Sequence, residues 1–303
     1  MKNLVFLFPG QGSQQVGMGK DLYENSDFAK KTFKIADEVL GYNFSKICFE
    51  GPEDELKLTH NTQPALLTVS YILYNLLDIE PIIAAGHSLG EYSAYLCAGT
   101  LKFEDAVLLV HKRGKYMQEA VPVGKGSMAA LIGADIEKVK NIVESIDGIV
   151  NLANWNSKSQ IVISGEKQAV EKAVEEINAP RSVFLQVSAP FHSELMKPAE
   201  EKLAIDLNKI EFKDPKYPII NNVDVKEITK GDDARDGLIR QVSRPVLWHS
   251  IMEKMLVEKE LTLYAEVGTG NVLTGLLRRT ARELDKKIEF FNISNFEDLN
   301  KLK

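Results

Sequence analysis

The 303-residue chain is long enough to bury a large core and to form more than one lobe. Hydrophobic residues make up 44% and charged residues 26% of the sequence, as in ordinary soluble globular proteins. The formal net charge of −6 argues against a general nucleic-acid or anionic-membrane binder, because either would favour a basic surface.

Cysteine usage and hydropathy suggest a cellular compartment. Cys48 and Cys97 lie in apolar surroundings without a CxxC pair, so we expect reduced, buried thiols. The first residues offer one lysine and about five apolar residues before Pro9, short for a signal peptide's roughly 7–15 apolar residues. No apolar run reaches the roughly 18–20 residues of a membrane span. We expect a cytoplasmic protein that binds neither nucleic acid nor membrane.

Strand-like and helix-like segments alternate along the chain, which is typical of an α/β fold with a mainly parallel sheet. A glycine-rich loop follows both the first and the last of the expected strands named here. These elements are the strand Leu4–Phe8, the strand Ile82–Ala85, the helix Leu89–Ala98, the helix Glu104–Gln118 and the strand Thr262–Val267.

The middle of the chain has a different order of elements. After a hinge-like "GKG" at residues 124–126, the pattern predicts the order βαββαβ, the split pattern of ferredoxin-like modules. We therefore expect a small lobe at residues 125–190, inserted into a large lobe formed by residues 1–124 and 191–303. The expected bounds are Met128–Ile132, Ile136–Glu144, Ile149–Ala153, Gln160–Ser164, Lys167–Ile177 and Ser182–Val187.

The strongest local motif is "PIIAAGHSLGEYSAYLCAG" at residues 81–99, which contains G-x-S-x-G around Ser88. This pattern indicates a nucleophile where a strand precedes it and a helix follows, because the sharp turn projects the serine outward. The predicted elements meet both conditions. Gly86 and Gly90 fit a turn too tight for side chains. The alternative is an ordinary glycine-rich turn between a strand and a helix.

A serine hydroxyl needs a base to become a good nucleophile. His192, in "SAPFHSELM", is the best candidate because it lies where the chain returns from the small lobe, at the edge of an expected cleft. It also follows the serine in the chain, as in hydrolase-like sheets. No carboxylate between the two residues stands out as a group to orient the histidine. Among the other histidines, His87 adjoins Ser88 and should point elsewhere, and His111 falls within a helix-like stretch. A structural role is the default for His60 and His249.

The loop "FPGQGSQ" after the first strand raises the possibility of a nucleotide site. Gly10 and Gly12 begin a G-x-G-x-x-G pattern, but Gln15 stands where the third glycine belongs. No clean acidic partner follows about 20 residues on. These residues argue against a dinucleotide site.

Further blocks follow one another in a fixed order with these motifs. They are "NTQPAL" (61–66), "KRGKYMQ" (112–118), "APFHS" (189–193), "NNVDV" (221–225), "RQVSRPVLW" (240–248) and "EVGTGNVLTGL" (266–276). With "FPGQGSQ" and "GHSLGEYSA", they make the chain strongly resemble malonyl-CoA:acyl-carrier-protein transacylases from about residue 6 to residue 280. These enzymes load malonyl groups onto the carrier protein of fatty-acid synthesis.

The resemblance implies a fold and a set of roles. The fold is a large α/β-hydrolase-like lobe with an inserted ferredoxin-like lobe. Ser88 matches the nucleophile and His192 the base, oriented by the backbone carbonyl of Gln241 instead of a carboxylate. A carbonyl still accepts the Nδ1–H and fixes the tautomer. The backbone N–H groups of Gln11 and Leu89 match the oxyanion hole.

Arg113 separates a malonyl transferase from other serine enzymes. By itself, an arginine in the helix-like "EDAVLLVHKRGKYMQEA" is most simply a solvated side chain. The resemblance places it in the acyl pocket, where a guanidinium would bind the malonate carboxylate through two parallel hydrogen bonds. It also implies that Phe191 narrows the room beside the acyl group and so favours malonyl. A core aromatic is the alternative for that residue.

The resulting hypothesis is a ping-pong transfer of malonyl from malonyl-CoA to the phosphopantetheine thiol of acyl carrier protein, through malonyl-Ser88. We expect no metal and no redox cofactor, and a monomer that docks the acidic carrier protein on a local basic patch. One alternative is a serine hydrolase such as a thioesterase. Another is a catalytically inactive partner-binding module.

Overall fold

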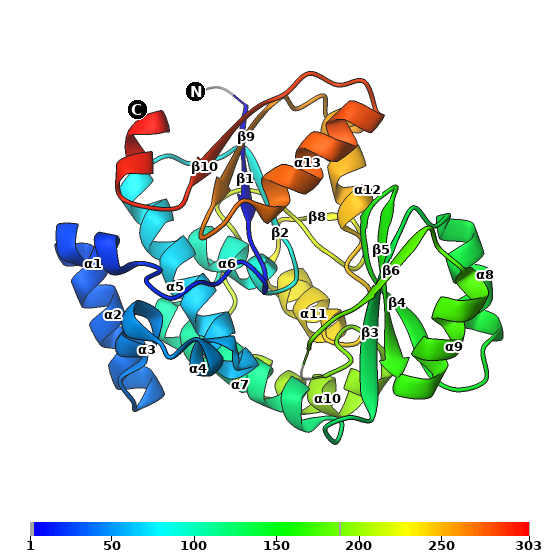
Figure 1. Ribbon diagram of the computed structural model, residues 1–303. Coiled ribbons are helices and arrows are strands. Elements are labelled where there is room, and N and C mark those ends of the chain that lie inside the picture. Colours follow the sequence, from blue (N-terminus) through cyan, green and yellow to red (C-terminus); the bar gives the residue numbers. More distant parts are fainter. Residues whose placement is uncertain (1–2, 188, 303) are drawn as a thin grey trace.

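The computed structural model describes residues 3–187 and 189–302, and within them the strands form two separate sheets (Figure 1). The expected α/β class with a parallel sheet is confirmed. The larger sheet has the order β10 (Glu289–Ile293), β9 (Leu263–Val267), β1 (Leu4–Phe8), β2 (Ile83–Gly86), β7 (Ile219–Ile220), β8 (Glu227–Ile228). The smaller sheet has the order β4 (Val150–Ser157), β5 (Gln160–Glu166), β3 (Gly126–Ile132), β6 (Arg181–Phe184).

The larger sheet is mainly parallel. β1 pairs in parallel with β2 and β9, β9 with β10, and β2 with β7, while β8 runs antiparallel to β7. The expected first strand is confirmed residue for residue, and all five of its residues are buried. The strand expected at Ile82–Ala85 begins and ends one residue later, and the one expected at Thr262–Val267 begins one residue later.

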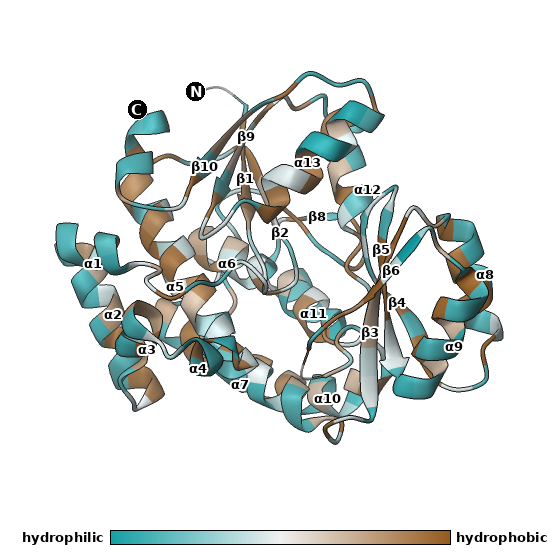
Figure 2. Cartoon of the chain, in the orientation of Figure 1, coloured by the Kyte–Doolittle hydropathy of each residue, from teal (hydrophilic) through white to brown (hydrophobic). Residues whose placement is uncertain are grey.

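Helices cover both faces of this sheet, and alternate residues of β1 therefore belong to two different hydrophobic clusters. Phe6 and Phe8 pack with α5 (Thr59–Leu77) and α6 (Leu89–Cys97). Val5 and Leu7 pack with α12 (Trp248–Glu253) and α13 (Val272–Glu283). Figure 2 shows apolar colour along the central strands and on parts of the covering helices α5 and α13. A parallel sheet buried on both faces requires this arrangement.

The remaining helices of the large lobe pack around this core. α7 (Phe103–Glu119) lies against α5 and extends one residue beyond the expected helix at each end, while α6 ends one residue earlier than expected. The others are α1 (Lys20–Asn25), α2 (Asp27–Leu40), α3 (Phe44–Glu50), α4 (Glu53–Lys57), α10 (Lys197–Leu207), α11 (Gly231–Gln241), the 3₁₀ turns η1 (Glu194–Met196) and η3 (Glu297–Leu302), and the π-helical turn η2 (Lys254–Glu258).

The smaller sheet is antiparallel, with β3 between β5 and β6 and β4 on the far side of β5. Its helices α8 (Ile136–Ser145) and α9 (Lys167–Ile177) lie on its outer face, away from the large lobe (Figure 1). The expected βαββαβ order is present. The expected last strand, 182–187, is wrong at its end, because β6 stops at Phe184 and residues beyond it turn toward a cavity between the lobes.

Two sequence expectations about the whole chain can be compared with this fold. Cys48 and Cys97 are free and buried, as predicted from their apolar surroundings. In the part of the chain that the structure describes, no helix combines the length and apolar character needed to cross a bilayer.

Candidate active site

Ser88 occupies a sharp turn between β2 and α6. Its backbone has φ 50° and ψ −104°, a conformation that non-glycine residues rarely adopt. A side chain on Gly86 would collide with the backbone of Gly90, and one on Gly90 with the carbonyl of Phe8. The two glycines therefore let strand and helix approach closely enough to hold the serine at the tip of the bend.

His192 faces this serine from the loop that returns from the small lobe. Its Nε2 lies 2.8 Å from the Ser88 Oγ. Its Nδ1 lies 2.9 Å from the carbonyl oxygen of Gln241 and 3.1 Å from that of Arg244. A carbonyl can only accept, so Nδ1 carries the proton and Nε2 presents its lone pair to the serine hydroxyl. The second carbonyl, from Arg244, was not predicted from the sequence.

The charge state of His192 follows from its surroundings. Burial, together with the positive charge of Arg113, lowers the pKa of His192 to about 3. The imidazole is therefore neutral at pH 7, which is the form that can accept a proton. No carboxylate is needed to select this tautomer, because the two backbone carbonyls already do so.

Arg113 is buried, with 1% of its surface exposed, so the interpretation as a solvated helix residue is wrong. Its Nη1 donates to the Gln63 Oε1 at 2.9 Å. Its Nη2 donates to the Gln241 Oε1 at 2.9 Å and to the Ser88 Oγ at 3.1 Å. The guanidinium also lies 5.1 Å from the ring centre of Tyr92. A full positive charge thus points at the nucleophile from α7.

These groups open into one cavity of about 140 Å³ between the lobes. Gln11, from the loop after β1, and Leu89, at the start of α6, both line it. The first N–H groups of a helix have no intrahelical partner, so the Leu89 N–H is free to bind an anion. Phe191 forms part of the wall and is 9% exposed, so it is a cavity residue and a core residue at once.

Three buried polar side chains around the site escaped prediction. Asn222 accepts the Ser88 N–H on its Oδ1 at 2.8 Å and donates to the Gly86 carbonyl at 2.7 Å. Gln63 holds Arg113, and Glu91 lies beneath the elbow with no exposed surface. Their local sequence gives no sign of burial, because each stands among other polar residues or in a helix where a polar side chain normally faces solvent.

The other histidines do not face the Ser88 hydroxyl. His87 is half-buried and lines the same cavity, but its Nε2 pairs with the Asn156 Oδ1 at 2.8 Å. His60 and His111 pack against each other on the outer side of α5 and α7. His249 packs on Trp155. Within residues 3–187 and 189–302, no three His, Cys, Asp or Glu side chains gather in a way that could hold a metal ion.

Comparison with known proteins identifies the family. The acyl transferase domain model matches residues 5–295. A malonyl CoA-acyl carrier protein transacylase of Bacillus subtilis (strain 168) is 47% identical over 293 residues, which cover 94% of this chain and 92% of the relative. The chain belongs to the malonyl-CoA:acyl-carrier-protein transacylases. The resemblance inferred from the sequence is thereby confirmed, and the protein is an acyltransferase.

Solved structures of this family have the same fold. An acyl carrier protein S-malonyltransferase from Vibrio cholerae superimposes with a TM-score of 0.95 at 41% identity, covering 100% of both chains. A malonyl-transacylase solved in complex with its type II PKS acyl-carrier protein gives a TM-score of 0.94 at 41% identity, covering 99% of both chains.

Proposed function

We propose that the protein moves a malonyl group from malonyl-CoA to the phosphopantetheine thiol of acyl carrier protein in fatty-acid synthesis, by a ping-pong mechanism. The observation that carries this proposal is that the Ser88 hydroxyl, the His192 imidazole and the Arg113 guanidinium line one cavity of about 140 Å³. Nucleophile, base and carboxylate receptor are thus close enough to engage one small acyl group.

In the loading step, the Ser88 Oγ attacks the thioester carbonyl of malonyl-CoA while His192 Nε2 takes the hydroxyl proton. The carbonyl oxygen becomes an oxyanion, which the backbone N–H groups of Gln11 and Leu89 stabilise. The carbon–sulfur bond then breaks, His192 returns its proton to the sulfur, and coenzyme A leaves as a thiol. The product is malonyl-Ser88.

In the transfer step, the thiol of the carrier protein's phosphopantetheine attacks the Ser88 ester. His192 takes the thiol proton, the same N–H pair holds the oxyanion, and the carbon–oxygen bond breaks. His192 then protonates the released Ser88 oxygen. Both steps balance with side chains and backbone of this chain, so the proposal includes no metal and no redox cofactor.

Arg113 supplies the preference for malonyl. Its guanidinium can bind the free carboxylate through two parallel hydrogen bonds. An acetyl group would leave the buried cation without a carboxylate partner, a loss of about 2–5 kcal/mol, which corresponds to about 30-fold to a few thousand-fold in kcat/KM. The malonyl carboxylate has a second effect. It offsets the positive charge that lowers the pKa of His192, so the base strengthens when the correct acyl group is bound.

The domain division that accompanies this proposal is residues 1–124 with 191–303, and residues 125–190. The antiparallel order β4-β5-β3-β6 supports a ferredoxin-like description of the inserted lobe. The nucleophile turn after a parallel strand supports a hydrolase-like description of the large lobe. The buried free thiols are in keeping with a cytoplasmic location. We further propose a monomer, with docking of the carrier protein on a local basic patch.

The test uses radiolabelled malonyl-CoA with and without phosphopantetheinylated carrier protein. We expect label to move to the carrier protein, with little free malonate, and Ser88→Ala to abolish the transfer. Free malonate as the main product would instead support a thioesterase. Failure of a serine-directed reagent to label Ser88 would support an inactive binding module.

A further inference from the structure

Glu91 is a charged residue of the site with no role in the steps above. It lies on α6, three residues after the nucleophile, and none of its surface is exposed. Placing a carboxylate in the interior is costly unless its oxygens are hydrogen-bonded. Its presence in a helix whose other buried residues are mostly apolar or aromatic therefore needs an explanation.

The contacts of Glu91 lead toward the acyl pocket. Its Oε2 accepts the Gln241 Nε2–H at 2.7 Å and the Asn222 backbone N–H at 3.0 Å. Its Oε1 is buried with no hydrogen-bond partner among the described residues. One oxygen of the carboxylate thus does all the bonding, and one of its two partners is the side chain that contacts Arg113.

The Gln241 side-chain amide has two chemically different ends, and its orientation matters. Its NH₂ faces three acceptors, the Glu91 Oε2 at 2.7 Å, the Ser88 carbonyl at 3.0 Å and, more distantly, the Asn222 Oδ1 at 3.4 Å. Its oxygen therefore faces the Arg113 Nη2, which can only donate. A flipped amide would set oxygen against oxygen at Glu91 and NH₂ against the guanidinium. The acceptor at Glu91 holds the orientation that Arg113 requires.

We propose that Glu91 is a positioning residue that fixes the Gln241 amide and thereby aims Arg113 at the carboxylate of the acyl group. The inference rests on the proposed malonyl transfer and extends it to the source of acyl selectivity. The property used is an acceptor oxygen, not a negative charge. Burial raises the pKa of Glu91 to about 7, and a protonated carboxyl keeps one carbonyl oxygen as an acceptor.

A merely structural role for Glu91 makes a different prediction. Through Asn222, Glu91 also supports the Ser88 N–H and the Gly86 carbonyl, and hence the nucleophile turn. Damage to that turn would slow every acyl donor by the same factor. Misalignment of Arg113 would slow malonyl more than acetyl. The ratio of kcat/KM for malonyl-CoA over acetyl-CoA separates the two roles.

The experiment compares Glu91→Leu, which removes the acceptor, with Glu91→Gln, which can place an acceptor oxygen where Oε2 lies. Thermal unfolding checks that both variants fold. We expect Glu91→Leu to lower the malonyl-over-acetyl ratio by about tenfold or more, because a misaligned Arg113 would lose one charged hydrogen bond to the malonyl carboxylate. We expect Glu91→Gln to keep the ratio within about threefold of the wild type.

A double-mutant cycle with Arg113→Ala tests whether the effect passes through the guanidinium. With Arg113 absent, Glu91→Leu should change the ratio by less than about twofold, because the interaction it serves is gone. A tenfold change that persists in the Arg113→Ala background would overturn the proposal. So would equal losses for both donors in Glu91→Leu, or a loss of the ratio in Glu91→Gln as large as in Glu91→Leu.

Affinity measurements keep this test independent of the transfer reaction. In a Ser88→Ala background, calorimetry gives the dissociation constants of malonyl-CoA and acetyl-CoA with and without the Glu91→Leu substitution. We expect the preference for malonyl-CoA to fall about tenfold with the leucine. If the wild type binds malonyl-CoA selectively but transfers nothing to the carrier protein, the proposed function fails while the role of Glu91 stands. An unchanged preference refutes that role.

Discussion

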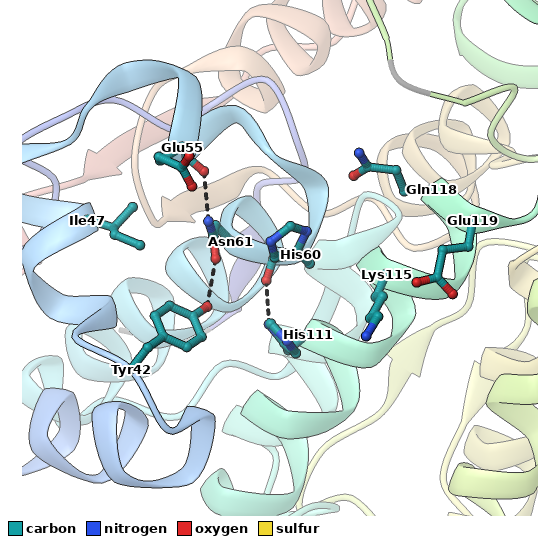
Figure 3. Close-up of a pocket in the computed structure, with 9 residues that line it drawn as sticks. All are labelled: Tyr42, Ile47, Glu55, His60, Asn61, His111, Lys115, Gln118 and Glu119. Atoms are coloured by element: carbon teal, nitrogen blue, oxygen red, sulfur yellow. Dashed lines mark hydrogen bonds between the residues drawn. The ribbon is translucent and has the colours of Figure 1, made fainter. Parts of the chain in front are cut away.

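The helices α5 and α7 carry two pockets on opposite sides, and only one of them contains a nucleophile. The inner cavity holds Ser88 and has a volume of about 140 Å³. The outer pocket is larger, about 490 Å³, and includes His60, His111 and Lys115 (Figure 3). Both pockets therefore offer a histidine and a cation, although the inner histidine, His192, comes from the loop before η1 and not from these two helices. Size and residue type alone would favour the outer one.

Several polar groups of the outer pocket are hydrogen-bonded to one another. The Tyr42 hydroxyl donates to the Asn61 Oδ1 at 2.6 Å, and the Asn61 Nδ2 donates to the Glu55 carbonyl at 2.8 Å. His111 Nδ1 donates to the His60 carbonyl at 2.9 Å. Figure 3 shows the Lys115, Gln118 and Glu119 side chains apart from this chain of hydrogen bonds. None of the described residues that line this pocket is a serine, threonine or cysteine that could act as a nucleophile.

The histidines make the comparison sharpest. His111 and His192 each donate Nδ1–H to a backbone carbonyl, so each presents Nε2 as an acceptor. Only His192 has a serine hydroxyl facing that nitrogen, held there by a strained backbone. An imidazole whose tautomer is fixed by a backbone carbonyl is therefore not enough to identify an active site. The nucleophile and the buried cation next to His192 distinguish it from His111.

The largest expected effect distinguishes His192 from His111. His192→Ala removes the base and should lower kcat/KM for malonyl transfer by at least about 10⁴-fold. His111→Ala is the matched control, and it should stay within about twofold of the wild type. Steady-state transfer kinetics with both variants provide the measurement. Comparable losses from the two substitutions would mean that the outer pocket takes part in the reaction.

Two of the cations on α7, Arg113 and Lys115, give the next effect. Arg113→Ala should lower kcat/KM for malonyl-CoA by about 10²-fold or more, with a much smaller loss for acetyl-CoA. Lys115→Ala, two residues further on, changes an exposed side chain without an ion pair among the described residues, and should change both donors by less than about twofold. Equal losses for the two donors in Arg113→Ala would make Arg113 a structural residue.

A smaller effect separates the polar residues of α5. Gln63→Leu leaves the Arg113 Nη1 without its acceptor and should lower the malonyl preference by about tenfold. Asn61→Leu breaks the hydrogen bonds to Tyr42 and Glu55 in the outer pocket. It should lower the unfolding free energy by about 1–3 kcal/mol and leave the preference unchanged. A changed preference in Asn61→Leu would argue that the pockets are coupled.

The smallest effect concerns pH. Because the pKa of His192 is lowered to about 3, its neutral form persists as pH falls from 8 to 5, and this base should cause no loss of kcat/KM with acetyl-CoA there. Arg113→Ala removes a positive neighbour, so the pKa of His192 rises and the acid limb moves to higher pH. Identical acid limbs near pH 6.5 in both enzymes would contradict this electrostatic link.

Much of the fold and the central pair of residues could be predicted from the sequence. The nucleophile turn could be recognised from the sequence because the contact that requires Gly86, with Gly90, lies within the turn itself. Gly90 is required in addition by the close approach to Phe8 on β1. Ser88 follows from that local geometry. The alternation of strands and helices reports burial periodicity, which is also local. His192 was reachable because a chain returning between lobes borders the cleft that they form.

The residues that escaped prediction depend on contacts between distant segments. Asn222 meets Ser88 across 134 positions, and Gln241 meets Glu91 across 150. No periodicity encodes such a meeting, and a buried glutamate in a helix reads like any solvent-facing residue. The early end of β6 has the same origin, because Leu185 and Val187 line a cavity that exists only after the lobes pack.

A crystal structure of the enzyme after reaction with malonyl-CoA, in the absence of carrier protein, tests the central claim most directly. We predict an ester on the Ser88 Oγ, its carbonyl oxygen at the N–H groups of Gln11 and Leu89, and its distal carboxylate on the Arg113 guanidinium. An adduct on another residue, or a malonyl group whose carboxylate lies away from Arg113, would contradict the account.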